Sequence, residues 1–280
     1  MHIDLKNLLT TQDRDPIEAL CRAKAQYMYQ GDHRAICRVL TKFLMQVDSR
    51  DLSLAPHLAL NGCWEMWVTM AIAARVKPGM TCIDVGANFG YYTLLLAELV
   101  GPTGRVEAWE PLRNVMDCLL NTITINGFND RTKFVAGAAG MPMHEGQEAV
   151  MVCLKSFFGG ARVSQLVTPP FQKTRYLSLD TTGLKTPIDF IKIDVEGSEA
   201  LVWDGMRRIL AESPNLQVLM EFTPKDHAAP EALLQQIEND GFRLLTVGHE
   251  GALRNITRQE AIVPDTGNHR MLWLSRFGSH

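Results

Sequence analysis

The sequence lacks three features that separate broad classes of protein: an excess of basic residues, a long apolar run and a charge-poor leader. Its formal net charge is −3 at pH 7, and general affinity for nucleic acid needs basic residues clustered on one face. No stretch has the length and apolarity of a membrane span, and residues 1–20 are too charged for a signal peptide. We therefore expect a cytoplasmic protein with neither a nucleic-acid nor a membrane partner.

Cysteines at metal-ligand spacing are also missing. The six cysteines are scattered, no two of them form a C-x-x-C motif, and several stand inside apolar runs. This pattern favours buried thiols in a reducing compartment over a disulfide framework or a zinc site. The six are Cys21, Cys37, Cys63, Cys82, Cys118 and Cys153.

An acid-then-glycine pattern, Asp84-x-Gly86-x-Asn88-x-Gly90, stands between a short apolar strand and a helix. Glycine lacks a Cβ, so the backbone of such a turn can approach a ligand closely, and the free N–H groups at the helix start add a positive field. Glu110 ends the next predicted strand, 20 residues after Gly90. An acid at that separation holds ribose hydroxyls in nucleotide-binding units. The two features together predict an adenosine-containing ligand.

The details of the turn favour one ligand over another. Asn88 replaces the middle glycine that admits a pyrophosphate, and Asp84 places a negative charge beside the turn. A carboxylate there repels a pyrophosphate but can hold the ammonium group of S-adenosylmethionine, directly or through water. We therefore expect S-adenosylmethionine as cofactor, rather than a nicotinamide dinucleotide. Further predicted contacts come from the turn, from its helix and from the ends of the next two strands: Ala87, Tyr91, Thr93, Pro111 and Ala138.

Ala138 belongs to a run of small residues, 137–140, that follows the third predicted strand. Such residues let the flat adenine ring lie against the backbone, although a plain tight turn explains them equally well.

Residues 1–60 are predicted to form a helical cap. Pro16 suits the first turn of a helix that ends near Gly31, and the apolar residues between 33 and 47 fit a second helix. Such a cap packs on the main domain or on a partner subunit, and it is consistent with a homodimer. Residues 61–277 form the main domain, and 278–280 are set aside as a remnant of cloning.

Three residues at the start of the main domain carry alternatives. Trp64 and Trp67 are expected to be packing anchors rather than substrate platforms. Glu65, between them, either faces the cofactor or is an exposed helix carboxylate.

Residues 148–179 interrupt the alternation of strands and helices. Segments 148–154 and 174–179 alternate like an antiparallel pair, and residues 155–173 join them. Structureless connections beyond about 12–15 residues are uncommon and are often lids. We predict a flap over the acceptor site with Gly159 and Gly160 as its hinge; surface decoration is the alternative.

The second half of the chain alternates strands with helices. The apolar run 188–193 ends in Asp194, and a second run, 216–220, ends in Glu221. Strands covered on both faces read as continuous apolar runs. A strand at 271–275 is expected to run antiparallel at or near one edge. The pattern predicts an α/β fold with a mainly parallel, doubly wound sheet and ligands beyond the carboxyl ends of its strands.

The assembled sequence resembles the FkbM-type family of S-adenosylmethionine-dependent methyltransferases. The matching pieces are KPGMTCIDVGANFGYYTLLLA (77–97), GRVEAWEP (104–111), IDFIKIDVEGSEALVWDGM (188–206) and VLMEFTP (218–224). The resemblance implies a seven-stranded Rossmann-like sheet and methyl transfer, mostly to hydroxyls of polyketides, sugars or other small molecules. It also implies that Asp84, Gly86, Asn88, Gly90 and Thr93 line the methionine side of the cofactor. Glu110 would hold the ribose, and Asp194 would stand at the reacting end.

O-methylation of a neutral hydroxyl needs a base, because an alcohol is a poor nucleophile until its proton is removed. Asp194 and Glu221 end neighbouring central strands and are the main candidates; their alternative role is to cap helix donors or to pair with a lysine such as Lys192. His249 and His227 are alternative bases, since histidine titrates near neutral pH. Glu196 either joins them or shapes the turn next to Glu199.

Other chemistries are less well supported by these residues. Asp194 and Glu221 supply only two oxygen ligands for a divalent cation, and the Asp-Asn pair of metal-dependent catechol-type enzymes is absent, so we expect no metal. Nucleic-acid amino-methyltransferases carry an [ND]-P-P-[YF] turn where this chain has Asp194-Val-Glu-Gly. A non-catalytic S-adenosylmethionine-binding subunit is the remaining alternative to an enzyme that methylates a small molecule or glycan.

Overall fold

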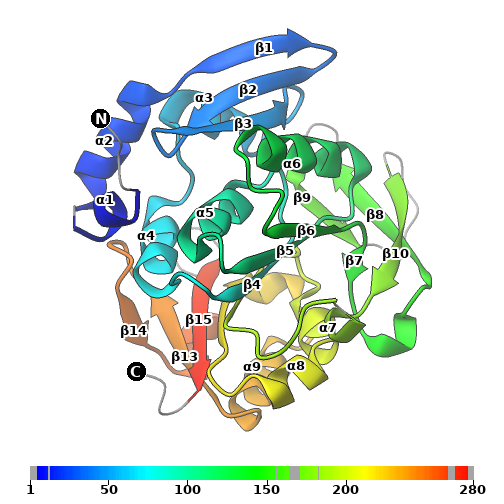
Figure 1. Cartoon of the computed structure of the whole chain (residues 1–280). Helices are drawn as coiled ribbons and strands as arrows, with labels where there is room; N and C mark the ends of the chain where they lie inside the picture. Colours follow the sequence, from blue (N-terminus) through cyan, green and yellow to red (C-terminus); the bar gives the residue numbers. More distant parts are fainter. Residues whose placement is uncertain are drawn as a thin grey trace.

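A twisted eight-stranded sheet forms the centre of the molecule (Figure 1). The computed structural model describes residues 5–11, 13–154, 157–163, 171–181, 183–263 and 269–276. Across the sheet the strands follow the order β14 (Leu253–Asn255), β13 (Phe242–Val247), β15 (Arg270–Arg276), β12 (Gln217–Phe222), β11 (Phe190–Ile193), β4 (Thr81–Val85), β5 (Arg105–Trp109) and β6 (Thr132–Val135).

Six of these strands run parallel, and β15 lies antiparallel between β12 and β13. This arrangement confirms the predicted α/β class and the antiparallel last strand. The short strand β14, which pairs antiparallel with β13 at the edge, adds one strand to the seven expected.

Helices cover both faces of the sheet, because alternate side chains of each strand enter two separate cores. In β4, Cys82 enters one core, whereas Ile83 and Val85 enter the other. The first core includes residues of α4 (Met66–Arg75), α5 (Tyr91–Val100) and α6 (Arg113–Ile125). The second includes residues of α7 (Glu199–Asp204), α8 (Arg207–Glu212), α9 (Pro230–Asn239) and α10 (Arg258–Ile262). Within the described residues, none of the helices combines the length and apolarity required to cross a bilayer.

The chain changes direction across the sheet at β4. From β4 it proceeds to β5 and β6 on one side, and it later returns to β11 and β12 on the other. In open α/β sheets, ligands bind beyond the carboxyl ends of the strands at such a switch point. The fold therefore places the expected site between the ends of β4 and β11.

The N-terminal segment is only partly helical. α1 (Leu5–Thr11), α2 (Arg14–Lys24) and α3 (Ala55–Asn61) flank a meander of β1 (Tyr27–Gly31), β2 (Arg34–Val39) and β3 (Phe43–Asp48). The helix predicted over 33–47 is therefore wrong, and the preceding helix ends at Lys24 rather than near Gly31. The buried residues recur every second position, as in a strand: Ala35, Cys37 and Val39 in β2, and Phe43, Met45 and Val47 in β3.

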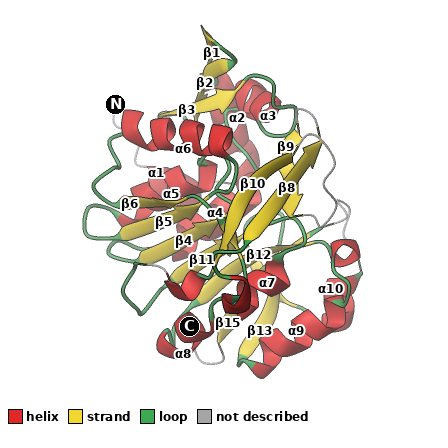
Figure 2. Cartoon of the chain, turned by 90° about the vertical axis from the view of Figure 1, so that its right-hand side faces the viewer, coloured by secondary structure: helices red, strands yellow, loops and turns green. Residues whose placement is uncertain are grey.

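The meander packs on the main domain through β3 and α6 (Figure 2). The backbone N–H of Gln46 donates to Thr122 Oγ1 at 3.0 Å, and the N–H of Leu44 donates to Asn126 Oδ1 at 3.2 Å. These bonds satisfy strand donors that no fourth strand pairs.

A small second sheet, in the order β7-β10-β8-β9, lies beside the central one (Figure 2). The predicted antiparallel pairing of β8 (Glu148–Leu154) with β10 (Phe171–Leu177) is confirmed. The connection between them contains a strand, β9 (Phe157–Val163), and Gly159 and Gly160 lie within it, so their predicted role as a loop hinge is wrong. The rest of the predicted flap, residues 155–156 and 164–170, lies outside the described residues, as does the tail 277–280.

Candidate functional site

Asp84, the penultimate residue of β4, has a fully buried carboxylate at the switch point. Its Oδ2 accepts a hydrogen bond from Thr93 Oγ1 of α5 at 2.6 Å, whereas its buried Oδ1 has no hydrogen-bond partner among the described residues. Burial raises the pKa of Asp84. An unsatisfied buried carboxylate oxygen is costly, so it marks a place where a cationic group would be stabilised.

The turn after Asp84 is held by backbone contacts that require glycine. Gly86 has a φ of +80°, and a Cβ on it would lie 1.8 Å from the carbonyl oxygen of Asp194. The N–H groups of Gly86 and Ala87 donate to the carbonyl of Trp109 at 3.0 and 2.9 Å. Gly90 has a φ of +97°, and a Cβ there would lie 2.5 Å from Leu119 Cδ1. The turn is thereby fixed against the ends of both β5 and β11.

Glu110 is joined to the glycine turn directly. Its Oε2 accepts the N–H of Asn88 at 3.0 Å, and its Oε1 accepts the N–H of Leu112 at 2.8 Å. Burial raises the pKa of Glu110 to about 7. Because a carboxylate has about four acceptor positions, two remain for a ligand. Asn88 has a φ of +51°, a strained conformation that positions its N–H toward Glu110.

Asp194, at the end of β11, forms an ion pair with Lys192. The Nζ atom of Lys192 lies 2.9 Å from Asp194 Oδ2 and 4.7 Å from the centre of the Tyr92 ring. Burial alone would lower the pKa of Lys192, but the charges of Asp194 and Asp84 outweigh it and raise that pKa. The lysine pairing weighed from the sequence as the alternative role of Asp194 is therefore present.

Two glutamates follow Asp194, and they have different roles. Glu199 shapes the turn, since its Oε1 accepts the N–H groups of Val195 and Gly197 at 3.3 and 3.2 Å. Glu196 has a φ of +52° and lines the cavity, and burial, reinforced by the charge of Asp194, raises its pKa to about 7.

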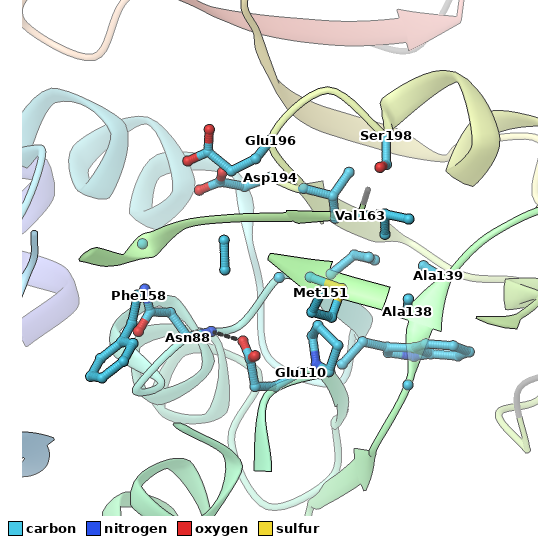
Figure 3. Close-up of a pocket in the computed structure, with 18 residues that line it drawn as sticks. Asn88, Glu110, Ala138, Ala139, Met151, Phe158, Val163, Asp194, Glu196 and Ser198 are labelled. Carbon is cyan, nitrogen blue, oxygen red and sulfur yellow. Dashed lines mark hydrogen bonds between the residues drawn. The ribbon is translucent and has the colours of Figure 1, made fainter. Parts of the chain in front are cut away.

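These pieces surround one cavity (Figure 3), where Asp194 and Glu196 stand on one side and Asn88 and Glu110 on the other. The cavity brings six of the predicted cofactor residues together: Gly86, Asn88, Glu110, Pro111, Ala138 and Asp194. The other five do not line it and support the turn from behind: Asp84, Ala87, Gly90, Tyr91 and Thr93. Tyr91 in particular is buried, with its hydroxyl 3.1 Å from Thr69 Oγ1.

Two strands of the second sheet contribute side chains to the lining of the cavity. Met151 of β8 and Phe158, Ala161 and Val163 of β9 line it. The N–H of Phe158 also donates to Asp51 Oδ1 at 3.2 Å, and the N–H of Gly159 donates to Ser53 Oγ at 2.9 Å. The sequence predicted a cover over the acceptor, whereas this cover lies on the cavity that contains the Glu110 carboxylate.

Neither predicted alternative histidine lines the cavity. His249 is exposed and contacts Arg14 and Trp67. His227 is buried; its ring stacks on Phe222, and its Nε2 lies 3.2 Å from Glu199. Because His249 lies outside the cavity, the cavity gives no support to its predicted role as a base.

A third histidine, His269, was missed. Its Nδ1 lies 4.0 Å from Glu221 Oε1, and its Nε2 lies 3.8 Å from Glu65 Oε1. Glu65 in turn accepts a hydrogen bond from the Tyr92 hydroxyl at 2.7 Å. The signal in the sequence was the position of His269 just before an antiparallel strand, which begins where its neighbour β12 ends.

Glu221 is surrounded by other carboxylates. Burial and the negative charges of Asp194, Glu65 and Glu196 raise its pKa to about 10. Within the described residues, no three His, Cys, Asp or Glu side chains are grouped so that they could hold a metal ion.

Comparisons with known proteins identify the family of the chain. The family model described as the methyltransferase FkbM domain matches residues 84–244, more than half of the chain. The protein-L-isoaspartate O-methyltransferase of Aeropyrum pernix is 37% identical over 70 residues, which are 24% of this chain and 27% of that protein. The enzyme of the same name from Methanococcoides burtonii is 26% identical over 99 residues, 35% of this chain and 45% of that protein. The chain thus spans less than half the length of these curated relatives.

Among solved structures, the FkbM methyltransferase of Methylobacillus flagellatus KT is similar with a TM-score of 0.46 and 16% identity, over 75% of this chain and 53% of that one. The family match includes the acid-glycine turn, Glu110, Asp194 and Glu221. The chain therefore belongs to the FkbM family of methyltransferases, and its cofactor is S-adenosylmethionine.

Proposed function

We propose that the chain is an O-methyltransferase that acts on a hydroxyl of a small molecule or glycan. One observation carries the proposal: the carboxylates of Asp84, Asp194 and Glu221, at the ends of β4, β11 and β12, act on the buried ammonium of Lys192, which lies 2.9 Å from Asp194 Oδ2. The name of the curated relatives, O-methyltransferase, supports oxygen as the acceptor atom.

The residues present fit S-adenosylmethionine. The buried carboxylate of Asp84 does not line the cavity, but it stands next in the chain to the lining residues Val85 and Gly86, so its negative charge favours the ammonium of the amino-acid part at this end. Glu110 has acceptor positions left for the ribose hydroxyls. Pro111 and Ala138 line the same cavity and provide apolar surface for adenine.

The bound cofactor supplies a methyl group on a sulfonium, a good leaving group, so the protein mainly has to align the reactants and accept a proton. Asp194 lines the cavity and is the carboxylate proposed to orient the acceptor or to take its proton. Glu221, on the neighbouring strand β12, is proposed only to orient the acceptor, because a carboxyl group with a pKa of about 10 keeps its own proton at neutral pH. Asp194 Oδ2 is engaged by Lys192, which fixes that carboxylate in position.

Asp194→Asn is expected to lower kcat by about 100-fold, since it removes a charge that either takes the proton or orients the acceptor. Transfer of labelled methyl groups to a panel of alcohols and sugars measures the rate, and calorimetry measures cofactor affinity. The control is Asp117→Asn on α6, where the side chain is exposed. An unchanged kcat in Asp194→Asn would rule out both roles.

Glu110→Ala is expected to weaken S-adenosylmethionine binding by about 10- to 100-fold. The change removes the predicted ribose acceptor and leaves the buried N–H groups of Asn88 and Leu112 without their partner, at a cost of about 1–3 kcal/mol. Calorimetric titration measures the loss, with the exposed Glu231→Ala as control. Equal affinities of the two variants would contradict the assignment of Glu110.

The same titration separates the enzyme from a non-catalytic subunit. We expect tight binding together with turnover on at least one hydroxyl acceptor. Binding with no transfer to any acceptor would favour the subunit.

A further inference from the structure

A second pocket, which includes Glu65 in its lining, is separate from the cavity described above. It is lined by residues of α2, α3, the segment before α4, the first turn of α4 and the position before β15: Arg14, Glu18, Arg22, His57, Asn61, Cys63, Trp64, Glu65, Met66, Trp67 and His269. The two cavities share no lining residue. Direct contacts nevertheless link them. The carboxylate of Glu65 accepts the Tyr92 hydroxyl at 2.7 Å, and Lys192 Nζ lies 4.7 Å from the centre of the Tyr92 ring and 2.9 Å from Asp194 Oδ2.

The backbone of Glu65 has a strained conformation. Its φ of +36° and ψ of +64° are left-handed, which is unfavourable for a residue with a side chain. Strain of this kind persists where the surroundings hold it and often marks a functional site. Here the Tyr92 hydroxyl holds the buried carboxylate at 2.7 Å, so that it faces the second pocket and His269.

His269 occupies the place where the second pocket meets the strand ends. Its ring nitrogens lie within 4.0 Å of one carboxylate on each side, Glu65 and Glu221, and its side chain is 34% exposed. Glu221 belongs to β12, the strand next to β11, which ends at Asp194. The ring therefore lies where the second pocket meets the strand ends, and imidazole is the side chain most often used as a general base.

The walls of the second pocket indicate the class of acceptor. Trp64 and Trp67 are two of its lining residues. The ring centres of Trp64 and His57 lie 4.9 Å apart, and the Arg14 guanidinium carbon lies 4.9 Å from the centre of the Trp67 ring. The lining also includes the amide of Asn61, the guanidinium of Arg22 and the carboxylate of Glu18. The C–H faces of a pyranose ring pack on aromatic rings while its hydroxyls need hydrogen-bonding groups around its edge, so this combination suits a sugar.

We infer that the second pocket is the acceptor site, that it takes a pyranose sugar, and that His269 is the base. This inference rests on the proposed function. As the bond from the sugar oxygen to the methyl carbon forms, the carbon–sulfur bond of the sulfonium breaks and the hydroxyl proton moves to a ring nitrogen of His269. The sulfur leaves as a neutral thioether, and the positive charge ends on the imidazolium of His269.

The binding half of the test uses the full chain saturated with S-adenosylhomocysteine. Methyl glycopyranosides of glucose, galactose, mannose and rhamnose are titrated and followed by saturation-transfer NMR. We expect at least one to bind, and Trp67→Leu and the milder Arg22→Ala to weaken it at least about fivefold without changing affinity for the nucleoside. If the nucleoside binds and no sugar does, the sugar assignment is overturned. If the nucleoside itself fails to bind, the proposed function falls and this inference falls with it.

The catalytic half compares His269→Asn with His33→Asn, an exposed histidine at the turn between β1 and β2. With a sugar that binds, we expect His269→Asn to lower kcat by about 100-fold or more, to leave the sugar KM within about threefold, and to be partly rescued by added imidazole. His33→Asn is expected to match the unmodified chain. Unchanged kcat in His269→Asn, or a loss confined to KM, would overturn the role of His269 while leaving the proposed function intact.

Discussion

Gly86→Ala is expected to abolish measurable binding of S-adenosylmethionine. The added Cβ would lie 1.8 Å from the carbonyl oxygen of Asp194, a backbone atom that no side-chain rotation can move. The φ of +80° adds a further cost of roughly 1–2 kcal/mol for a residue with a side chain. The ends of β4 and β11 must therefore separate, which displaces both the turn and Asp194 from the cavity.

A matched variant separates the steric clash from the backbone strain. Gly127, after α6, has a similar φ of +76°, but a Cβ there meets no atom within 4 Å. We expect Gly127→Ala to lose some thermal stability and to keep its cofactor affinity, whereas Gly86→Ala loses the affinity. Calorimetric titration and thermal unfolding of both variants check this, and normal binding by Gly86→Ala would show that the turn does not form the site.

Lys192→Met is expected to destabilise the fold by about 3–5 kcal/mol, the usual cost of removing one partner from a buried ion pair. Lys192 is 2% exposed, and its charge is the cation between Asp84, Asp194 and Glu221. Without it, these carboxylates are left in a region of low polarity with no compensating charge.

The stability lost in Lys192→Met is expected to be greater at high pH than at low pH. Burial raises the folded-state pKa of Asp84 and Glu221 above their ordinary values. The charge of Lys192 opposes this rise, so in Lys192→Met the two pKa values rise further and the folded variant takes up more protons than the folded unmodified chain as pH falls. The deficit of Lys192→Met is therefore smaller at pH 5.5 than at pH 8. Urea unfolding at both pH values measures it.

The control for this prediction is Lys173→Met. Lys173 forms an ion pair of the same length, 2.9 Å with Glu148, but both side chains are more than half exposed. Exposed pairs contribute about 0–1 kcal/mol, so this variant should unfold almost like the unmodified chain. Equal losses in the two variants would contradict a buried charge cluster around Lys192.

The cofactor half of the site was predictable because its signals are local. Asp84, Gly86 and Asn88 lie within one turn, and Glu110 follows at a separation set by a single helix and strand. The alternation of apolar runs also gave the parallel sheet and the antiparallel last strand.

The proposed acceptor site was not predictable because tertiary contacts assemble it. Glu65 and His269 are 204 positions apart and meet only because β15 inserts antiparallel beside β12. From the sequence, Asp194 and Glu221 were the main candidates for the base, with His249 and His227 as alternatives. The position of His249 in a glycine-containing turn carried no information about what lies nearby. The order of strands in the sheet places His269, and not His249, beside Glu221.

The N-terminal meander was misread for a different reason. Ile36, Val39, Leu40, Phe43 and Leu44 have helical spacing, yet Leu44 is 36% exposed while Ala35 and Cys37 are buried. Small buried residues in β2 carried the alternating pattern, and the larger apolar side chains obscured it.

A crystal structure of the chain grown with S-adenosylhomocysteine is the most direct measurement. We expect the ribose hydroxyls within about 3 Å of the Glu110 carboxylate, the amino-acid part beside Asp84 and Gly86, and the sulfur toward Asp194. A nucleoside bound elsewhere, or a ribose that leaves Glu110 without contact, would contradict the assignment of this cavity.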